Sequence, residues 1–210
     1  AGGGLCDETV VRYTVEHARE SIEWLIEQGV SFTRDDMTTE TYHLTQEGGH
    51  SHRRVIHSAD ATGRAVETTL LDKAKAHPNI SLFPFHIGID LITTRKHMAA
   101  EDNQCLGCYV LDIQKDQPKT FLAPVTVLAT GGAGKVYLYT SNPDVSTGDG
   151  IAMGWRAGCR IANMEFIQFH PTCLFHPKAK SFLISEALRG EGATLKLANG
   201  TRFMPAFHPQ

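Results

Sequence analysis

Residues 125–134 read Val-Thr-Val-Leu-Ala-Thr-Gly-Gly-Ala-Gly, an apolar and partly β-branched run that ends in three glycines. The run predicts a buried strand that ends near Leu128. The glycines predict a tight turn at its carboxyl end, where the backbone can approach a bound molecule closely. Nucleotides bind at this edge of open α/β sheets. The stretch therefore favours an α/β fold with a ligand at the turn, and a plain tight turn is the alternative.

Two better-known phosphate-binding motifs do not fit this stretch. Gly134-Lys135 resembles the end of a P-loop, but Val136 stands where a magnesium-binding hydroxyl residue belongs. Ala129 also stands at the position of the first P-loop glycine. A full dinucleotide-binding fingerprint, Gly-x-Gly-x-x-Gly, is absent as well. The sequence therefore excludes a P-loop.

The sequence upstream begins with helices. Asp7 can cap a first helix, which Gly29 ends in a left-handed conformation. The apolar residues of this helix recur at helical spacing and predict one buried stripe, made of Val11, Val15, Ala18, Ile22 and Leu25. A polar stretch without regular structure is expected over residues 33–57. A second helix is expected over residues 62–77, where Pro78 stops it.

Beyond Pro78 the hydrophobic pattern changes from helical to alternating. The segments that read as strands are residues 80–85, 87–94, 106–113 and 120–128. The short polar links between them favour an antiparallel meander within an otherwise α/β protein. Residues 146–156 read as a turn and a helix rich in small residues, which predicts close backbone packing. Asn199-Gly200 predicts a tight hairpin.

Composition narrows the classes of function. The chain has 210 residues, 41% of them hydrophobic and 20% charged, with a formal net charge of −3 and a mean hydropathy of −0.20. No apolar run approaches the roughly 20 residues of a membrane-spanning helix, and no basic excess suits a nucleic-acid surface. Membrane and nucleic-acid partners are therefore not expected. Five scattered cysteines without a signal-peptide pattern favour a reducing, cytoplasmic location.

A dense polar cluster lies at residues 47–54, which read Glu-Gly-Gly-His-Ser-His-Arg-Arg. We interpret it as a clamp in which Glu47 binds an ammonium group and Arg53 or Arg54 binds a carboxylate or a phosphate. A charged, glycine-containing segment is by default a solvated loop, and that reading is the alternative.

No metal site is predicted. His50, His52 and His57 make no recognisable ligand set, because no carboxylate or cysteine completes it. The Cys105-Leu-Gly-Cys108 pair stands alone and cannot supply four thiolates. It also lies in a predicted strand rather than at a helix start, where a redox thiol is activated. The pair is therefore interpreted as incidental.

Three further motifs combine polar groups with glycines or a proline. Thr147-Gly-Asp-Gly150 opens the small-residue helix, so Asp149 either complements the helix dipole or contacts a ligand hydroxyl, as acidic residues do on a ribose. His170 precedes a proline and is either a packed core residue or part of a site. Glu186 and Arg189 lie three apart on one predicted helical face, as a surface pair or as site residues.

Read together, in this order and spacing, these motifs resemble the succinate dehydrogenase/fumarate reductase flavoprotein family. The resemblance covers essentially all 210 residues and rests on residues 129–133, 147–150, 168–172, 186–192 and 202–204. Within the family, Tyr42-His-Leu44 and the run at residues 47–54 resemble the branch that oxidises L-aspartate.

The resemblance implies a role for each motif. FAD, held non-covalently, would contact Ile87, Gly88, Thr130, Gly131 and Asp149. The substrate would be bound by Glu47, Gln168, His170 and Ser185. Glu186 and Arg189 would belong to a catalytic proton-delivery relay. Glu47 would mark the L-aspartate branch, because a carboxylate attracts an α-ammonium group and repels a bare dicarboxylate.

The implied activity is FAD-dependent oxidation of L-aspartate to iminoaspartate, the first step of NAD biosynthesis through quinolinate, with O2 or fumarate as the electron acceptor. A fumarate reductase or succinate dehydrogenase flavoprotein subunit is the alternative, and Glu47 speaks against it. A non-catalytic module that keeps only the fold is a third reading.

The fold class expected is α/β: a partial FAD-binding, Rossmann-like domain with an antiparallel β-meander over residues 1–163, then the start of an α+β capping domain over residues 164–210. The first βαβ unit with its glycine fingerprint is missing, and the acid/base arginine is expected beyond Gln210. We therefore expect an internal fragment that is inactive alone and does not retain FAD. An exposed sheet edge would favour non-native association.

Overall fold

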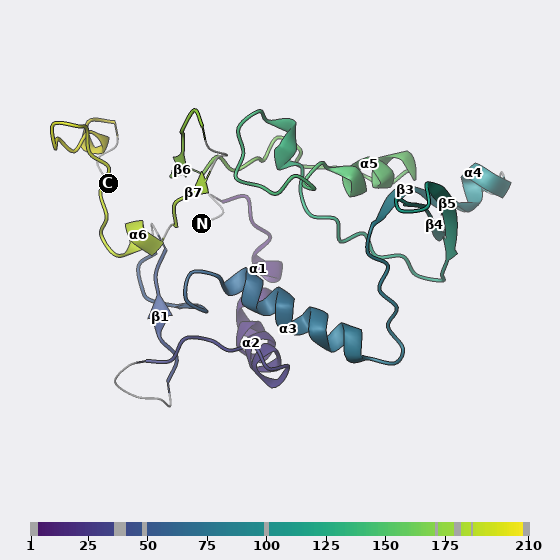
Figure 1. The fold of residues 1–210 in the computed structure, drawn as a ribbon, viewed down its shortest axis with the longest axis horizontal. Helices are drawn as coiled ribbons and strands as arrows, with labels where there is room; N and C mark the ends of the chain where they lie inside the picture. The colour runs from purple at the N-terminus through teal and green to yellow at the C-terminus, as the bar shows by residue number, and fades with distance from the viewer. Residues whose placement is uncertain are drawn as a thin grey trace. The chain divides into compact units, whose positions relative to one another are not determined.

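The computed structural model describes residues 4–35, 41–47, 50–98, 101–170, 172–178, 182–185 and 187–207. Its contacts divide the chain into two compact units, each described here by itself (Figure 1). The terminal unit comprises Ala1–Leu82 together with Ser185–Gln210, and the central unit comprises Phe83–Ile184.

The terminal unit begins with helices α1 (Glu8–Glu16) and α2 (Ala18–Glu27). The Asp7 carboxylate accepts hydrogen bonds from the Thr9 and Val10 amides, which confirms the predicted cap. Gly29 ends the second helix at a φ of 100°. The prediction of one continuous helix was wrong, because the chain breaks at His17, whose Nδ1 lies 2.8 Å from the Tyr13 carbonyl oxygen.

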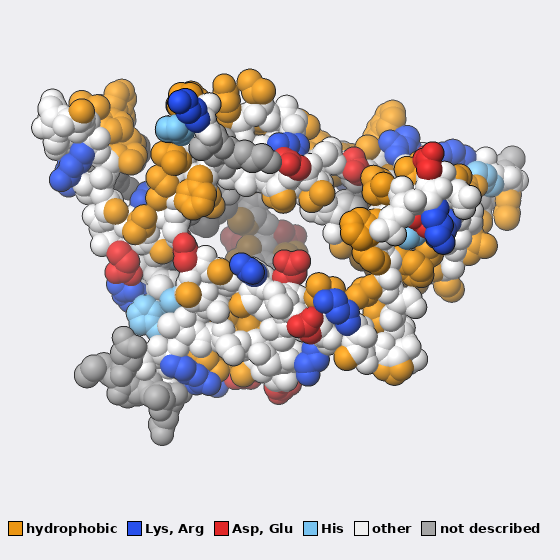
Figure 2. Space-filling model, in the orientation of Figure 1, with side chains coloured by type: hydrophobic (Ala, Val, Ile, Leu, Met, Phe, Trp, Pro, Cys, Tyr) orange, Lys and Arg blue, Asp and Glu red, His pale blue; other side chains and the backbone are white. Residues whose placement is uncertain are grey.

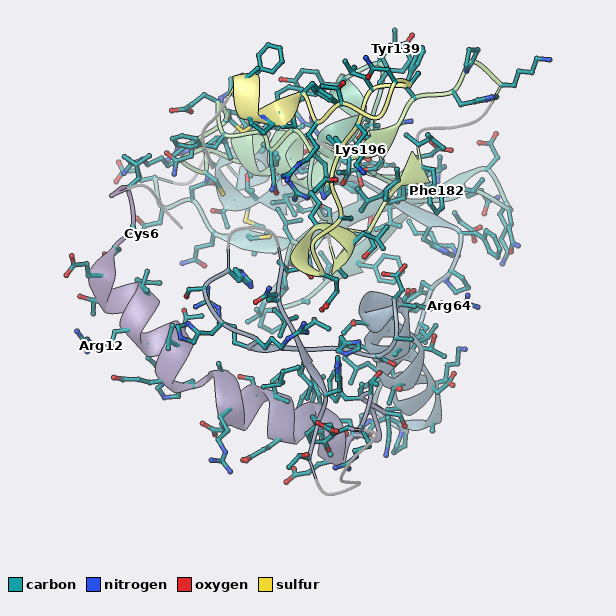
Figure 3. The ribbon with its side chains drawn as sticks, turned by 90° about the vertical axis from the view of Figure 1, so that its left-hand side faces the viewer. Cys6, Arg12, Arg64, Tyr139, Phe182 and Lys196 are labelled. Carbon is teal, nitrogen blue, oxygen red and sulfur yellow. The ribbon has the colours of Figure 1, made fainter. Side chains whose placement is uncertain are left out.

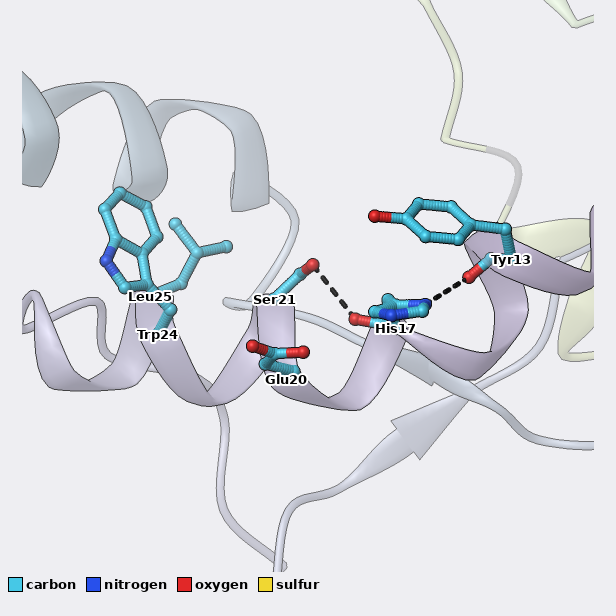
Figure 4. A pocket seen from close by; sticks show the side chains of 6 residues that line it. All are labelled: Tyr13, His17, Glu20, Ser21, Trp24 and Leu25. Atoms are coloured by element: carbon cyan, nitrogen blue, oxygen red, sulfur yellow. Dashed lines mark hydrogen bonds between the residues drawn. The ribbon is translucent and has the colours of Figure 1, made fainter. Parts of the chain in front are cut away.

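The predicted buried stripe on these helices was also wrong. Neither α1 nor α2 contains a buried residue, and the Val15 side chain is 68% exposed. A shallow hollow of about 640 Å³ follows one side of the two helices and is lined by Tyr13, His17, Glu20, Ser21, Trp24 and Leu25 (Figure 4). The Tyr13 and His17 rings stack at 4.1 Å within it. Within the stripe, Val11, Val15 and Ala18 are exposed, whereas Ile22 and Leu25 are half-buried.

Helix α3 (Thr62–Ala76) confirms the second predicted helix. The prediction that the polar stretch before it has no regular structure was wrong. This stretch contains β1 (Leu44–Thr45), which pairs antiparallel with β2 (Val55–Ile56). An isolated bridge joins Arg34 to Tyr42. Backbone hydrogen bonds make these short pairings, and such bonds do not require an alternating pattern of hydrophobic side chains. The sequence pattern therefore did not predict them. The β1–β2 loop, of which the structure describes residues 46–47 and 50–54, therefore has fixed ends.

The predicted meander is confirmed in the central unit. Strands β3 (His86–Thr93), β4 (Cys105–Asp112) and β5 (Gln117–Leu122) form one antiparallel sheet in that order. Residues 80–85 do not form the predicted strand, and the strand predicted over 120–128 ends at Leu122. The buried strand expected at Val125–Leu128 is also wrong, since Val125 and Val127 are 76% and 80% exposed. A strand needs a hydrogen-bonded neighbour, and no described residue supplies one there.

Helix α5 (Asp149–Arg156) packs on β3, where Met153 contacts Gly88. Met153 and the β3 residues Leu91 and Ile92 are buried. Asp90 of β3 fixes this packing, since its Oδ1 accepts from Arg156 Nε at 3.2 Å and its Oδ2 from Lys96 Nζ at 2.6 Å. These ion pairs hold the pKa of the Asp90 carboxyl below its usual value, although burial opposes the shift. The small-residue helix therefore lies against the sheet, as its sequence predicts.

Short elements complete the chain. They are α4 (Thr94–Met98), the 3₁₀ turns η1 (Gly134–Val136) and η2 (Met204–Ala206), β6 (Cys173–Leu174) paired with β7 (Phe182–Leu183), and α6 (Ala187–Gly190). The predicted hairpin at Asn199-Gly200 is confirmed by a bridge between Lys196 and Arg202.

Much apolar surface is exposed. Figure 2 shows hydrophobic side chains at the surface around β3–β5, where Phe85, Ile87, Ile89 and Leu122 are between 43% and 71% exposed. Contiguous exposed apolar surface marks an association site in soluble proteins. Among the described residues, no helix is long and apolar enough to cross a membrane.

Candidate functional site

The glycine-rich turn lies against the amino-terminal end of α5. The Thr130 side chain occupies the space that a Cβ on Gly150 would need, so only glycine fits there without a shift. The Gly148 amide donates to the Gly132 carbonyl at 3.2 Å, and Gly148 caps α5 at a φ of 79°. Gly131 has a φ of 72°, which glycine adopts without strain. The structure therefore brings Thr130, Gly131 and Asp149 together.

Strand β3 meets the same helix. A Cβ on Gly88 would lie 3.4 Å from the Met153 Cε, so β3 and α5 approach closely at this point. Ile87 precedes it on the strand and is exposed. The five residues that the resemblance assigns to the cofactor therefore all lie in the central unit. They stand on the glycine turn and on β3, which both contact α5, and on α5 itself.

Gln168 and His170 line a hollow of about 380 Å³ in the same unit. Its walls come from the glycine turn, the following loop and the segment before β6, including Gly132, Ala133, Tyr137, Tyr139 (labelled in Figure 3), Asn142 and Phe169. The Tyr137 and Phe169 rings meet edge to face at 5.0 Å. The hollow is thus continuous with the turn that carries Thr130 and Gly131.

The half-buried His170 ring is oriented by Thr172. Its Nδ1 accepts from the Thr172 amide at 3.2 Å and lies 3.1 Å from Thr172 Oγ1. Thr172 is itself buried, and its hydroxyl donates to the Ile184 carbonyl at 3.0 Å. The position of Thr172 is therefore fixed by the segment before α6, and with it the orientation of the imidazole ring.

In the terminal unit, the β1–β2 loop is tied to the α6 segment, residues 187–192. Arg53 forms a bidentate ion pair with Glu191, with Nη1 to Oε1 at 2.7 Å and Nη2 to Oε2 at 2.8 Å. The pair lowers the pKa of the Glu191 carboxyl and raises that of the Arg53 guanidinium. Gln46 Nε2 also donates to the Gly190 carbonyl at 2.9 Å. These contacts join residues more than 130 positions apart.

Glu47 lies within this loop with one carboxylate oxygen unsatisfied. Its backbone is fixed, because the His50 amide donates to the Glu47 carbonyl at 3.0 Å and the Glu47 amide to His50 Nδ1 at 3.3 Å. Its Oε2 atom is buried and meets no hydrogen-bond donor among the residues that the structure describes. A buried acceptor of this kind costs free energy unless a donor reaches it. The carboxylate is therefore suited to a cationic, hydrogen-bonding ligand.

The remaining predicted site residues follow β7. The Ser185 hydroxyl accepts from the amide of Ala187, the first residue of α6, at 3.3 Å. The Arg189 Nε atom is buried in the same segment. Glu186 lies outside the described residues. Gln168 and His170 belong to the central unit, whereas Glu47, Ser185 and Arg189 belong to the terminal unit.

Sequence reasoning missed the partner of Arg53. The sequence marked Arg53 as an anion-binding candidate, and it assigned no role to Glu191, which stands between Gly190 and Gly192. Two opposite charges in separate glycine-flanked motifs were the available signal, although it does not specify a pairing. The contact between His43 and His57 was missed as well: His43 Nδ1 lies 2.8 Å from His57 Nε2. Across the described residues, no three His, Cys, Asp or Glu side chains gather into a metal-binding group.

Comparisons with known proteins agree with this arrangement. Residues 1–210 match the FAD binding domain family. The chain is 66% identical over 206 residues to L-aspartate oxidase 1 of Ralstonia nicotianae, and 62% identical over 215 residues to L-aspartate oxidase of Pseudomonas aeruginosa. These alignments cover 98% and 100% of the chain, but 38% and 40% of the relatives, so the chain spans about two fifths of their length.

The fold matches solved structures too. A structure of quinol fumarate reductase from E. coli superposes with a TM-score of 0.86 at 31% identity. The match covers 98% of this chain and 33% of that one. The mixed α/β arrangement therefore corresponds to part of a fumarate reductase flavoprotein.

Proposed function

This chain belongs to the FAD binding domain family and is a homologue of L-aspartate oxidases, and on that premise we propose that it is part of an enzyme that oxidises L-aspartate to iminoaspartate. Its place would be the first step of NAD biosynthesis through quinolinate, with O2 or fumarate taking the electrons. The five cysteines are all free, which fits a reducing cytoplasm.

The residues of the central unit fit FAD. Neither Gly131 nor Gly132 has any heavy atom within 4 Å of a Cβ placed on it, so the turn presents bare backbone to open space. Asp149 is exposed in the first turn of α5, where its carboxylate can accept a ligand hydroxyl. We assign Ile87, Gly88, Thr130, Gly131 and Asp149 to the cofactor. When bound, FAD supplies the two-electron redox chemistry, and the protein supplies placement and charge.

In this proposal, Glu47 is the residue that selects L-aspartate over succinate. Its buried, unsatisfied Oε2 is the observation on which the proposal rests. The α-ammonium group of L-aspartate supplies both the donor and the opposite charge, whereas succinate supplies neither. Unit charges about 4 Å apart attract or repel by roughly 4 kcal/mol at an effective dielectric constant of about 20. The same carboxylate therefore favours an amino dicarboxylate and disfavours a bare one.

The other residues position the substrate and move its proton. Gln168, His170 and Ser185 would hold substrate carboxylates, and His170 is already oriented by Thr172. Glu186 and Arg189 would form a proton relay, with the acid/base arginine in a part of the enzyme outside these residues. Fixing both carboxylates keeps the Cα in one place relative to the redox centre. The domain division at residues 163/164 is part of the same proposal.

A fumarate reductase or succinate dehydrogenase subunit is the second candidate, favoured by the fold match to quinol fumarate reductase. The two candidates are separated by the substrate of the full-length protein that carries this chain. We expect L-aspartate oxidation, measured as iminoaspartate formation with O2 or fumarate, at a far higher kcat/KM than succinate oxidation. Oxidation of succinate without oxidation of L-aspartate would overturn the proposal in favour of the second candidate.

A further inference from the structure

Two contacts bracket Glu47 on the β1–β2 loop. Gln46 lies directly before it and bonds to Gly190, which directly follows Arg189. Arg53 lies at the far end of the loop and bonds to Glu191. The loop that carries Glu47 and the segment that carries Arg189 are therefore joined at two points, one on each side of Glu47.

The two segments meet at van der Waals distance. A Cβ on Gly190 would collide with the backbone carbonyl of Gln46, so the backbones themselves are in contact. The Glu47 Oε2 and Arg189 Nε atoms are both buried in this region. A small shift of either segment would therefore change the position of the carboxylate that receives the substrate.

Arg53 is already engaged on both of its terminal nitrogens. Nη1 and Nη2 donate to the two oxygens of Glu191, and Nη1 also lies 3.4 Å from the Leu44 carbonyl oxygen. This fork-to-fork geometry is the preferred arrangement of an arginine with a carboxylate. In this arrangement the guanidinium binds the protein's own carboxylate and not a substrate carboxylate.

The ion pair contributes little to global stability. The Arg53 and Glu191 side chains are 45% and 50% exposed, and exposed pairs add little to the free energy of unfolding. Its effect is therefore local: it fixes the geometry of one loop. Variants at these two positions are expected to fold, which makes the inference testable.

We propose that Arg53 is a positioning residue, whose ion pair with Glu191 holds the Glu47 loop against the Arg189 segment so that Glu47 receives the substrate ammonium group. The inference rests on the proposed function for its substrate. It adds that the Arg53–Glu191 pair acts on substrate recognition through Glu47 and does not bind substrate itself.

The test uses Arg53→Gln, Glu191→Gln and the exchanged pair Arg53→Glu/Glu191→Arg in the full-length protein. Each single variant is expected to raise the KM for L-aspartate by about tenfold with kcat changed by less than about twofold, and the exchanged pair to recover most of this loss. Arg19→Gln is the control, because Arg19 forms an ion pair with Glu23 on α2 whose side chains are 89% and 55% exposed. Its KM and melting temperature should equal those of the parent.

A direct substrate role for Arg53 gives the opposite result. Glu191→Gln would then free the guanidinium, lower the KM for L-aspartate and succinate alike, and overturn the inference. Equal KM values in all variants would overturn it as well.

Amide hydrogen exchange tests, without any substrate, whether the Arg53–Glu191 ion pair holds the β1–β2 loop in place. The His50 and Arg54 amides donate within the loop, to the Glu47 and Thr45 carbonyls. They should exchange faster in Arg53→Gln and return towards the parent rate in the exchanged pair. Unchanged exchange rates would contradict the positioning of the loop by this ion pair. Faster exchange in a protein that does not oxidise L-aspartate would support the positioning of the loop and contradict the proposed function.

Discussion

In the central unit, the Thr130 side chain of the glycine turn fills the space beside Gly150 of α5, whereas in the terminal unit the β1–β2 loop and the α6 segment are joined by the side chains of Arg53, Glu191 and Gln46. At Gly150 no side chain fits beside Thr130. At Arg53 a long side chain spans to Glu191 while remaining 45% exposed. The first contact depends on shape and tolerates no added atom. The second depends on charge and direction, and it adjusts a loop without supporting the fold.

The largest effect is expected at Gly150. Gly150→Ala places a methyl group where the Thr130 side chain lies, and overpacking of this kind costs about 1–3 kcal/mol. In the full-length protein, thermal unfolding should show a lower melting temperature, and the flavin absorbance band per protein should fall. Adding Thr130→Gly to the same variant should restore the melting temperature.

Gly63→Ala in α3 is the matched control, because nothing lies within 4 Å of a Cβ at Gly63. It should leave the melting temperature unchanged or slightly raised. If Gly150→Ala behaved like this control, the turn and helix would not be in contact, and the contrast between the units would disappear.

A smaller, pH-dependent effect is expected at Asp112 in the β4–β5 hairpin. Its buried carboxylate accepts from Lys119 Nζ at 2.6 Å and from the Lys115 amide at 3.2 Å. The Lys119 contact holds the pKa of Asp112 below its usual value, although desolvation opposes the shift. A carboxyl with a lowered pKa stabilises the fold above its unfolded pKa, and this contribution is lost as the pH falls through the folded value.

Asp112→Asn should therefore lower the melting temperature at neutral pH and converge with the parent in acid. Melting curves between pH 7 and about pH 2 measure the difference. Asp116→Asn, at the exposed tip of the same hairpin, is the control and should follow the parent at every pH. A constant gap between Asp112→Asn and the parent across this range would contradict the ion-pair explanation.

The same contrast explains what the sequence could predict. Strands β3–β5, α3 and α5 follow local patterns of alternation, helical spacing and small residues, so their existence was predictable. The residues proposed for the cofactor lie together because the glycines at 131, 148 and 150 serve one turn and one helix end. Each of these signals lies within a short stretch of the chain.

The sequence-based predictions failed where the structure of a segment depends on residues far away in the sequence. Val125–Leu128 is apolar enough for a strand, but hydrogen bonding to a neighbouring strand cannot be read from its own residues. The polar stretch before α3 contains β1 and β2, which its side-chain pattern did not predict because the two strands pair through backbone groups. The Arg53–Glu191 pair joins positions 138 residues apart, and no local pattern encodes it. The sequence pointed to Glu47 as a candidate, whereas the burial of its unsatisfied Oε2 atom could be seen only in the structure.

The most direct measurement is the effect of Glu47→Gln on two activities of the full-length protein. The substitution keeps the shape of the side chain and removes the charge that meets the ammonium group. The KM for L-aspartate should rise about a hundredfold, while the KM for fumarate in fumarate reduction stays within about threefold of the parent. Glu67→Gln, exposed on α3, should change neither value. Equal loss of both activities in Glu47→Gln would contradict the role of Glu47 as the residue that selects the amino group.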